Sequence, residues 1–248
     1  MRLRRSAHQG AVKMKIIPIG RNRVMAAVVV SALFAATSAV AEAPAGAMTA
    51  SDHKPPKNES PMRLNAPRIA PLQDVELTDE QLAILAPLIA RDQLYNIFRT
   101  FARTPKALQT FLAWGGYIMS ADNSLTPRQR EIVILRVGYL CRSGYEFAQH
   151  VLIGLQSGLT EAEIARIKQG AEAGWTPDEA ALIRMADELV TDHFVSDPTW
   201  AQLRAHFSEK NVMDAVYTAG QYTQVSMFLN TFGVQLDQGL ALDPDLRR

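Results

Sequence analysis

Three side chains near the middle of the chain, Glu131, Glu146 and His150, have the types and spacing needed to move a proton. Glu146 and His150 are four residues apart, so on a helix they share one face. A carboxylate beside an imidazole raises the imidazole pKa and fixes its tautomer, as general acid–base catalysis near neutral pH requires. The spacing predicts His150 as a general acid or base with Glu146 beside it, although an ordinary i,i+4 helix pair has the same spacing.

Glu131 lies at the start of the most apolar stretch of the chain, directly before residues 132–135. A carboxylate that enters a core must be paired or hydrogen-bonded, or its pKa rises. Arg128 or Arg136 could be its partner, so Glu131 is either a third catalytic residue or a structural one. A single Glu-x-x-x-His spacing is a weak metal-ligand pattern, and we expect no metal site here.

Polar residues spaced by four interrupt an apolar stretch near the C-terminus: Tyr222, Ser226 and Asn230. On a helix they form one stripe, which could bind a substrate or hydrogen-bond a neighbouring helix. With Arg136 they are the predicted substrate-binding residues. Arg99 and Arg103 are alternative cations that could meet a negative charge developing during catalysis.

The remaining histidines and the one cysteine are weaker candidates for catalysis. His193 and His206 lie among polar neighbours near expected helix ends, where a solvent-facing position is the default. A single cysteine, Cys141, excludes a disulfide scaffold and an all-cysteine metal site within the chain. We expect Cys141 to be a small buried hydrophobic residue.

The elements that must position these residues are helices. Between the expected helix starts, apolar residues recur at spacings of three and four, and no alternating strand pattern bounded by hairpin turns is present. Even the β-branched run 132–140 follows a Thr-Pro cap, which favours a buried helix. We predict an all-α domain of about seven or eight helices. Capping boxes, or prolines at a first helical position, mark starts at residues 78–81, 126–129, 160–163, 176–179, 197–198 and 208–209.

The N-terminal segment has the pattern of an export signal. Residues 1–23 are basic, residues 24–36 form an uncharged apolar run, and Ala39-Val40-Ala41 is a small-x-small cleavage pattern. We predict that residues 1–41 are a signal peptide, cleaved after Ala41, and that the protein is periplasmic or secreted. The alternative for this segment is a short membrane anchor. Met14 is an alternative start of the chain. Six of the 13 prolines fall in residues 42–72, which predicts a disordered linker before a folded domain over 73–248.

The charge balance excludes one class of partner. Residues 1–41 contain seven basic residues and no acidic one, so the rest of the chain has 19 basic and 25 acidic residues, a net charge of −6. An acidic chain repels phosphate backbones, and we expect no nucleic-acid binding. No later segment approaches eighteen consecutive apolar residues, so we expect no membrane association after cleavage.

Three central segments carry a family resemblance: residues 125–136 (LTPRQREIVILR), 145–150 (YEFAQH) and 158–164 (GLTEAEI). They resemble the carboxymuconolactone decarboxylase family, which shares its all-helical fold with the alkylhydroperoxidase D-like proteins. Residues 220–236 are similar to a longer subgroup of that family, and with residues 68–72 the resemblance covers nearly all of 68–240. It implies one alkylhydroperoxidase D-like helical domain and a homotrimer or homohexamer.

The peroxidase branch of that family uses a Cys-x-x-Cys-x-x-x-His motif with a glutamate twelve residues before the first cysteine. Counted back from His150, the two cysteine positions are Ser143 and Glu146 in this chain, and Glu131 falls on the glutamate. A dithiol cycle needs two sulfurs within bonding distance. The resemblance therefore argues against a cysteine-dependent hydroperoxidase.

The decarboxylase branch keeps the Glu-x-x-x-His arrangement, present here as Glu146 and His150, and implies no organic cofactor. By this resemblance His150 moves a proton at the carbon that gains or loses it, while Glu146 and Glu131 position the imidazole. The predicted function is a cofactor-independent lyase, or a related proton-transfer enzyme, acting on a small carboxylated lactone or enol. The alternative is a non-catalytic oligomeric protein of the same fold that binds a small molecule.

Overall fold

The structure, a computed structural model, describes residues 64–246. These residues form nine α-helices and two short 3-10 helices and contain no strand, which confirms the all-α prediction with more helices than the seven or eight expected. The predicted signal peptide 1–41 and residues 42–63 of the linker lie outside the described residues. The elements are η1 Asp74–Glu76, α1 Asp79–Ile89, α2 Asn96–Phe101, α3 Pro105–Met119, α4 Pro127–Leu140, α5 Gly144–Gln156, α6 Glu161–Ile167, α7 Pro177–Thr191, α8 Asp197–His206, α9 Glu209–Phe232 and η2 Pro244–Leu246.

The helices α2 and α3 have weaker start signals than the others: α2 has neither a cap nor a proline, and α3 has only the proline at its first position. Thr78, Thr126 and Thr160 form the expected capping boxes, in which the hydroxyl accepts a hydrogen bond from the N3 backbone N–H. By contrast, Tyr95 and Thr104, the N-cap residues of α2 and α3, make no side-chain capping bond. Tertiary packing therefore defines these two helices.

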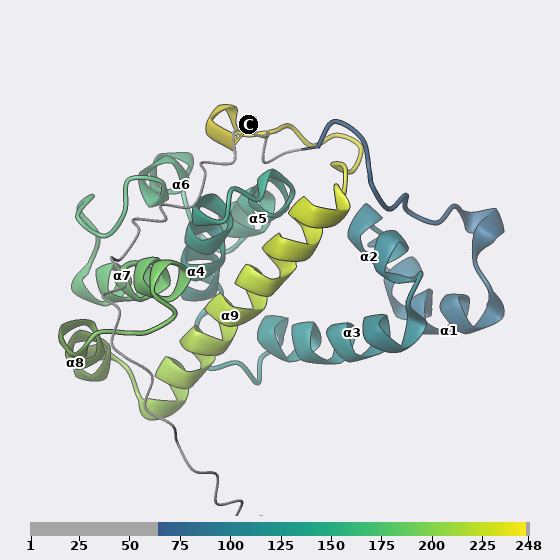
Figure 1. The fold of residues 1–248 in the computed structure, drawn as a ribbon. Helices are drawn as coiled ribbons and strands as arrows, with labels where there is room; N and C mark the ends of the chain where they lie inside the picture. The colour runs from purple at the N-terminus through teal and green to yellow at the C-terminus, as the bar shows by residue number, and fades with distance from the viewer. Residues whose placement is uncertain (1–63, 247–248) are drawn as a thin grey trace, which may run out of the picture. The chain divides into compact units, whose positions relative to one another are not determined.

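Helix α4 is the central element of the described residues, and it contacts α5, α6, α7 and α9 (Figure 1). Every residue from Arg130 to Gly138 is buried, so α4 has no solvent face and no marked amphipathic pattern. The β-branched run in α4 is a buried helix, as predicted. Glu131 enters the core on this helix and is fully buried.

Helix α9 joins two hydrophobic clusters along its length (Figure 1). Its first half supplies Val212, Ala215 and Ala219 to a cluster shared with α4 and α7. Its second half supplies Val225 and Leu229 to a cluster shared with α1, α2 and α3. No helix within residues 64–246 combines the length and apolar character needed to cross a membrane.

The segment before α1 packs on the helical domain, although the sequence-based boundary placed it in the linker. The backbone N–H groups of Arg68 and Ile69 both donate to the Phe232 carbonyl, at 2.9 and 3.1 Å. Leu72 is buried, and its N–H bonds to the Arg99 carbonyl. The ordered part of the domain therefore includes residues 64–72, because backbone pairing offsets their lack of large apolar side chains.

Helix α5 lies close against α4 at Gly154. A Cβ atom at this position would lie 3.1 Å from Leu159 Cδ1 and 3.2 Å from Leu135 Cδ1. The absence of a side chain at Gly154 therefore allows the close approach of the two helices. This approach brings His150 of α5 to Glu131 of α4.

Candidate active site

Glu131, Glu146 and His150 form one buried cluster, as their spacing suggested. His150 Nδ1 lies 2.7 Å from Glu131 Oε2, and His150 Nε2 lies 3.0 Å from Glu146 Oε1. The three residues are 0%, 5% and 6% exposed, respectively. Each ring nitrogen of the imidazole therefore faces a carboxylate oxygen away from bulk water.

The two carboxylates keep the imidazole protonated. Burial alone lowers the pKa of His150, but the charge and hydrogen bond of Glu131, followed by those of Glu146, outweigh it and raise this pKa to about 10. A ring with a proton on each nitrogen matches an acceptor on each side. At neutral pH, His150 is therefore protonated.

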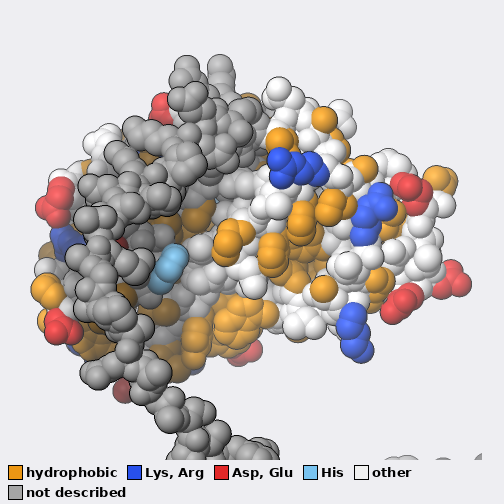
Figure 2. Space-filling view, in the orientation of Figure 1, with side chains coloured by type: hydrophobic (Ala, Val, Ile, Leu, Met, Phe, Trp, Pro, Cys, Tyr) orange, Lys and Arg blue, Asp and Glu red, His pale blue; other side chains and the backbone are white. Residues whose placement is uncertain are grey.

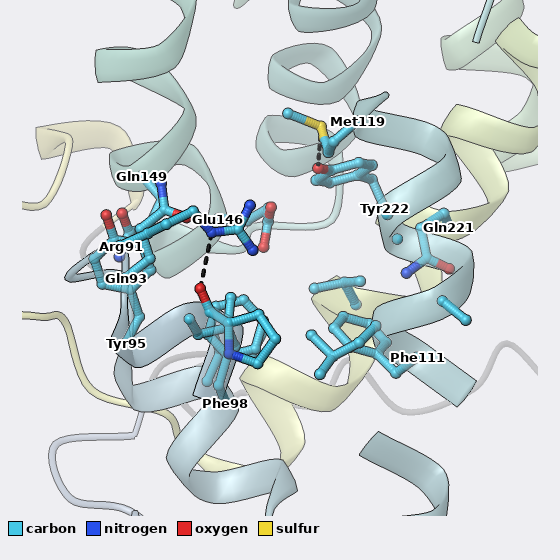
Figure 3. A pocket seen from close by; sticks show the side chains of 18 of the residues that line it. Arg91, Gln93, Tyr95, Phe98, Phe111, Met119, Glu146, Gln149, Gln221 and Tyr222 are labelled. Atoms are coloured by element: carbon cyan, nitrogen blue, oxygen red, sulfur yellow. Dashed lines mark hydrogen bonds between the residues drawn. The ribbon is translucent and has the colours of Figure 1, made fainter. Parts of the chain in front are cut away.

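Tyr222 of α9 packs edge-on against the His150 ring, with ring centroids 4.9 Å apart and planes at 86°. Its hydroxyl donates to Met119 Sδ at 3.2 Å, a weak acceptor (Figure 3). Burial, followed by the negative charges of Glu146 and Glu131, raises the pKa of Tyr222 well above its ordinary value. The phenol therefore stays protonated and can donate a hydrogen bond to a bound molecule.

A cavity of about 900 Å³ opens beside this cluster, and Glu146, His150 and Tyr222 line it. Glu131 does not line the cavity, so it acts from behind the imidazole. Figure 3 shows Glu146 and Tyr222 at the wall of the cavity, with the aromatic rings of Phe98 and Phe111 below them. The apolar lining comes mainly from α1, α2, α3 and α9, including Ile84, Leu88, Ile97, Phe98, Phe111, Leu112 and Val225.

Arg136, predicted to bind substrate, lies elsewhere in the fold. Its Nε donates to Asp187 Oδ1 at 2.5 Å, and its Nη1 donates to the carbonyls of Ile167 and Lys168 at 2.8 and 3.0 Å. Arg136 thus joins α4 to α7 and to the C-terminal end of α6, and it does not line the cavity. The structure gives it a structural role, because its hydrogen bonds are used within the protein.

Of the predicted stripe on α9, only Tyr222 reaches the cavity. Asn230 donates from Nδ2 to the Cys141 carbonyl at 2.9 Å and so caps the end of α4. Ser226 is fully buried and lies outside the cavity lining. Residues spaced by four share a helix face, but each step moves about 6 Å along the axis, so a cavity at one level meets only part of the stripe.

The alternative cations Arg99 and Arg103 also lie outside the cavity lining. Arg99 Nη1 bonds to the Leu72 carbonyl and to Asp74, and Arg103 Nε donates to the Ala70 carbonyl. Both side chains hold the segment before α1 against α2. Neither can meet a charge that develops next to His150.

Arg91 and Gln221 also line the cavity, and neither is in the set predicted to bind substrate, although Gln221 is one of the polar residues that interrupt the apolar C-terminal helix. Gln221 directly precedes Tyr222 in α9, is 5% exposed and lines the cavity. The sequence feature that could have indicated this position is a polar residue on a largely buried helix. Arg91 follows α1 in a turn, and nothing in the sequence links that turn to the cavity.

Cys141 and Ser143 lie at the junction of α4 and α5. Cys141 is the C-cap residue of α4, and Ser143 is the N-cap residue of α5. Burial raises the pKa of the Cys141 thiol, which does not line the cavity. Within residues 64–246, no group of three or more His, Cys, Asp and Glu side chains is arranged to hold a metal ion.

A model of the carboxymuconolactone decarboxylase family matches residues 105–188, which include Glu131, Glu146 and His150. This part of the chain belongs to that family. The resemblance found in the sequence is therefore confirmed. No curated protein matches the chain.

Solved structures show that the chain has an alkylhydroperoxidase D-like fold. The alkylhydroperoxidase AhpD core of an uncharacterized peroxidase-related protein from Ralstonia eutropha JMP134 is 20% identical, with a TM-score of 0.62 over 69% of this chain and 93% of that chain. An uncharacterized peroxidase-related protein from Silicibacter sp. TM1040 is 14% identical, with a TM-score of 0.58 over 73% and 95%. The debrominase Bmp8 in complex with 2,3,4-tribromopyrrole is 12% identical, with a TM-score of 0.59 over 71% and 94%.

Proposed function

We propose that this protein is a cofactor-independent proton-transfer enzyme of the decarboxylase type, acting on a small carboxylated lactone or enol. The observation that carries the proposal is His150, protonated between two buried carboxylates at the wall of a cavity. Perturbed titratable groups that meet in an apolar cavity are typical of catalytic sites. Membership of the carboxymuconolactone decarboxylase family supports the same class of reaction.

The proposed reaction breaks the bond between the substrate's carboxylate and its neighbouring carbon. The carboxylate leaves as CO₂, and the bonding electron pair stays on the substrate as an enolate. His150 then delivers a proton to that carbon, directly or through Glu146, which also lines the cavity. Solvent returns a proton to His150 after the product has left, so the enzyme is regenerated without an oxidant or a reductant.

The enolate oxygen needs a hydrogen-bond donor, and Tyr222 fits this role. Its phenol is buried and stays protonated, and it donates its hydrogen bond to Met119 Sδ, a weak acceptor. A stronger acceptor such as an enolate oxygen would take this bond from the sulfur. Donors held in a water-poor site stabilise developing charge at little reorganisation cost.

Glu131 is a positioning residue in this proposal, because it does not line the cavity. Its Oε2 atom accepts the Nδ1 proton of His150 and so fixes the ring orientation. Its charge is also the largest contribution that raises the pKa of His150. Loss of Glu131 should therefore lower the activity that depends on His150 without abolishing it.

A cysteine-dependent hydroperoxidase fits these residues less well, although two of the structural neighbours are described as peroxidase-related. Cys141 is the one cysteine of the chain, and burial raises the pKa of its thiol. A thiolate is the reactive form, so a raised pKa makes Cys141 a poor nucleophile. No second thiol is present to complete a dithiol cycle.

We also propose that the protein assembles as a homotrimer or homohexamer. Supporting this, Trp114 of α3 and Met213, Tyr217 and Met227 of α9 are large apolar side chains that remain exposed. Figure 2 shows hydrophobic side chains gathered over the middle of the face on which α9 and α3 lie. Light scattering on the purified protein tests the assembly, and the mass of a monomer would contradict it.

We propose, finally, that the enzyme acts outside the cytoplasm. The support is the signal-peptide pattern of residues 1–41. Intact-mass analysis of the protein recovered from the periplasm of an expressing bacterium should give a chain that starts at Glu42. A cytoplasmic protein that retains residues 1–41 would contradict the proposal.

The reaction is tested with a panel of carboxylated lactones, β-keto acids and organic hydroperoxides, followed by mass spectrometry. Loss of CO₂ with wild type, absent in His150→Gln but retained in Glu172→Gln, is the expected result. Glu172 is an exposed residue outside the cavity and serves as the matched control. Isomerisation without mass loss would indicate another proton transfer. Absence of turnover would favour the binding-protein alternative, and hydroperoxide consumption would contradict the proposal.

A further inference from the structure

We infer that the cavity binds an amphipathic monoanion that carries a second polar group, with its anionic end on Arg91 and its other polar end on Gln221. This inference rests on the proposed function only in taking the cavity as the substrate site. It adds the class of ligand and two specificity-determining residues outside the His150 cluster.

Arg91 supplies the anion site. It is the one Lys or Arg side chain among the described residues that line the cavity. Its Nε donates to the Pro87 carbonyl at 2.9 Å, which fixes the guanidinium against the end of α1 (Figure 3). Its two Nη groups have no hydrogen-bond or ion-pair partner within residues 64–246, so the donors that pair with a carboxylate remain available.

The charges around the cavity orient an anion toward Arg91. Glu146, the one carboxylate of the lining, is paired with protonated His150, so Arg91 is the cation of the lining that has no carboxylate partner. In Figure 3, Arg91 lies with Gln93, Gln149 and Glu146 on one side of the cavity, and Tyr222 lies on the opposite side. An anion that enters the cavity is therefore most stable at the Arg91 side.

Gln221 supplies the second polar contact. Its side chain is 5% exposed, lines the cavity and makes no hydrogen bond to any other described residue. Its amide therefore faces the cavity without a protein partner, and its donor and acceptor are available to a ligand hydroxyl or carbonyl. Figure 3 shows Gln221 beside Tyr222, across the cavity from Arg91.

The lining between these two anchors is apolar. Phe98 and Phe111 lie along the cavity between the Arg91 side and the Gln221 side (Figure 3), and Leu88 and Leu112 add to this wall. A volume of about 900 Å³ falls in the upper part of the range of pockets that hold drug-sized molecules. The ligand body is therefore apolar where it contacts this wall, and the cavity has room for more than a single ring.

Three probes separate the two anchors: 6-hydroxy-2-naphthoate has both polar ends, 2-naphthoate has the anion alone, and 2-naphthol has the hydroxyl alone. Binding is measured by isothermal titration calorimetry with wild type, Arg91→Met and Gln221→Leu. Arg204→Met is the matched control, since Arg204 is an exposed residue of α8 outside the cavity. Circular dichroism checks that each variant keeps its helices.

We expect Arg91→Met to weaken both carboxylates about tenfold or more and to leave 2-naphthol unchanged, because one charge-assisted pair is lost. Gln221→Leu should abolish the preference of wild type for 6-hydroxy-2-naphthoate over 2-naphthoate. Arg204→Met should bind all three probes as wild type does.

Equal binding of the carboxylates by Arg91→Met and Arg204→Met would overturn the inference. So would a preference for the hydroxyl that survives in Gln221→Leu, or no measurable binding of 6-hydroxy-2-naphthoate to wild type at millimolar concentration. These readouts need no turnover. The roles of Arg91 and Gln221 are therefore tested separately from the decarboxylase proposal. That proposal fails if CO₂ release is absent or does not depend on His150.

Discussion

The Nδ1 atom of His150 lies 2.7 Å from the Oε2 atom of Glu131, and this contact joins α5 to α4 inside the protein. Glu131 is 0% exposed and does not line the cavity, whereas His150 does. The Glu131 carboxylate therefore cannot touch a bound molecule, and in the proposed function it positions the imidazole that faces the cavity.

Replacement of Glu131 by Gln should lower the pKa of His150. In wild type, burial lowers this pKa and the two carboxylates raise it to about 10. In Glu131→Gln, Glu146 alone opposes the effect of burial, so the pKa of His150 should fall by about one unit or more. NMR titration of the His150 ring protons measures the change, with Glu172→Gln as the control. An unchanged pKa in Glu131→Gln would contradict this assignment of the Glu131 charge.

The same pKa predicts how stability depends on pH. The folded-state pKa of His150, about 10, lies above the ordinary histidine pKa of 6.5. The stabilisation from its protonation is therefore complete below pH 6.5 and is lost as the pH rises through about 10. The free energy of unfolding should fall by up to about 1.4 kcal/mol per pH unit across this range, relative to His150→Gln.

Urea unfolding of wild type and His150→Gln across that range measures this difference. The comparison cancels the titration of the groups that do not contact His150. Parallel stability curves for the two proteins would show that His150 is not held protonated by its carboxylates.

Replacement of Arg136 by Met should destabilise the fold and leave substrate binding unchanged. Arg136 bonds to Asp187 and to the carbonyls at the end of α6. Loss of these bonds leaves a partly buried carboxylate without its cation, at a cost of about 2–4 kcal/mol. Chemical denaturation measures the loss. A higher KM with unchanged stability would instead restore the substrate-binding role that the sequence suggested.

Replacement of Cys141 by Ala should leave turnover unchanged. The thiol lies outside the cavity, and burial raises its pKa. Neither wild type nor Cys141→Ala should therefore consume organic hydroperoxides, as measured by a peroxide-specific colorimetric assay. Peroxide consumption by wild type that disappears in Cys141→Ala would support the peroxidase chemistry disfavoured above.

Part of the buried cluster of Glu131, Glu146 and His150 could be predicted from the sequence, because local rules determine it. The i,i+4 spacing places Glu146 and His150 on one helix face, and a carboxylate inside an apolar run must find a partner. The partner of Glu131 could not be identified from local rules. The residues suggested Arg128 or Arg136 for Glu131, whereas the structure pairs Glu131 with His150. Such a contact between two helices depends on their packing, which Gly154 allows.

Which residues face the cavity was hard to predict, because α4 and α9 each pack against several other helices. Helix α4 is buried all round, and α9 contacts α3, α4, α5, α7 and α8. In such helices an apolar periodicity does not show which side faces a cavity. Arg136 and Asn230 therefore looked like binding residues but serve the fold. Arg91 comes from a turn that tertiary packing alone brings to the cavity.

The most direct test of the central claim is to run the reaction in D₂O on the substrate that the panel identifies, with wild type, His150→Gln and Glu172→Gln. Wild type and Glu172→Gln should release CO₂ and place one deuteron on the carbon that carried it. In His150→Gln the rate should fall by about 10²–10⁴-fold, the usual contribution of a general acid, while the helical circular dichroism is retained. A His150→Gln variant that releases CO₂ at the wild-type rate, with the same deuterium in the product, would contradict the account.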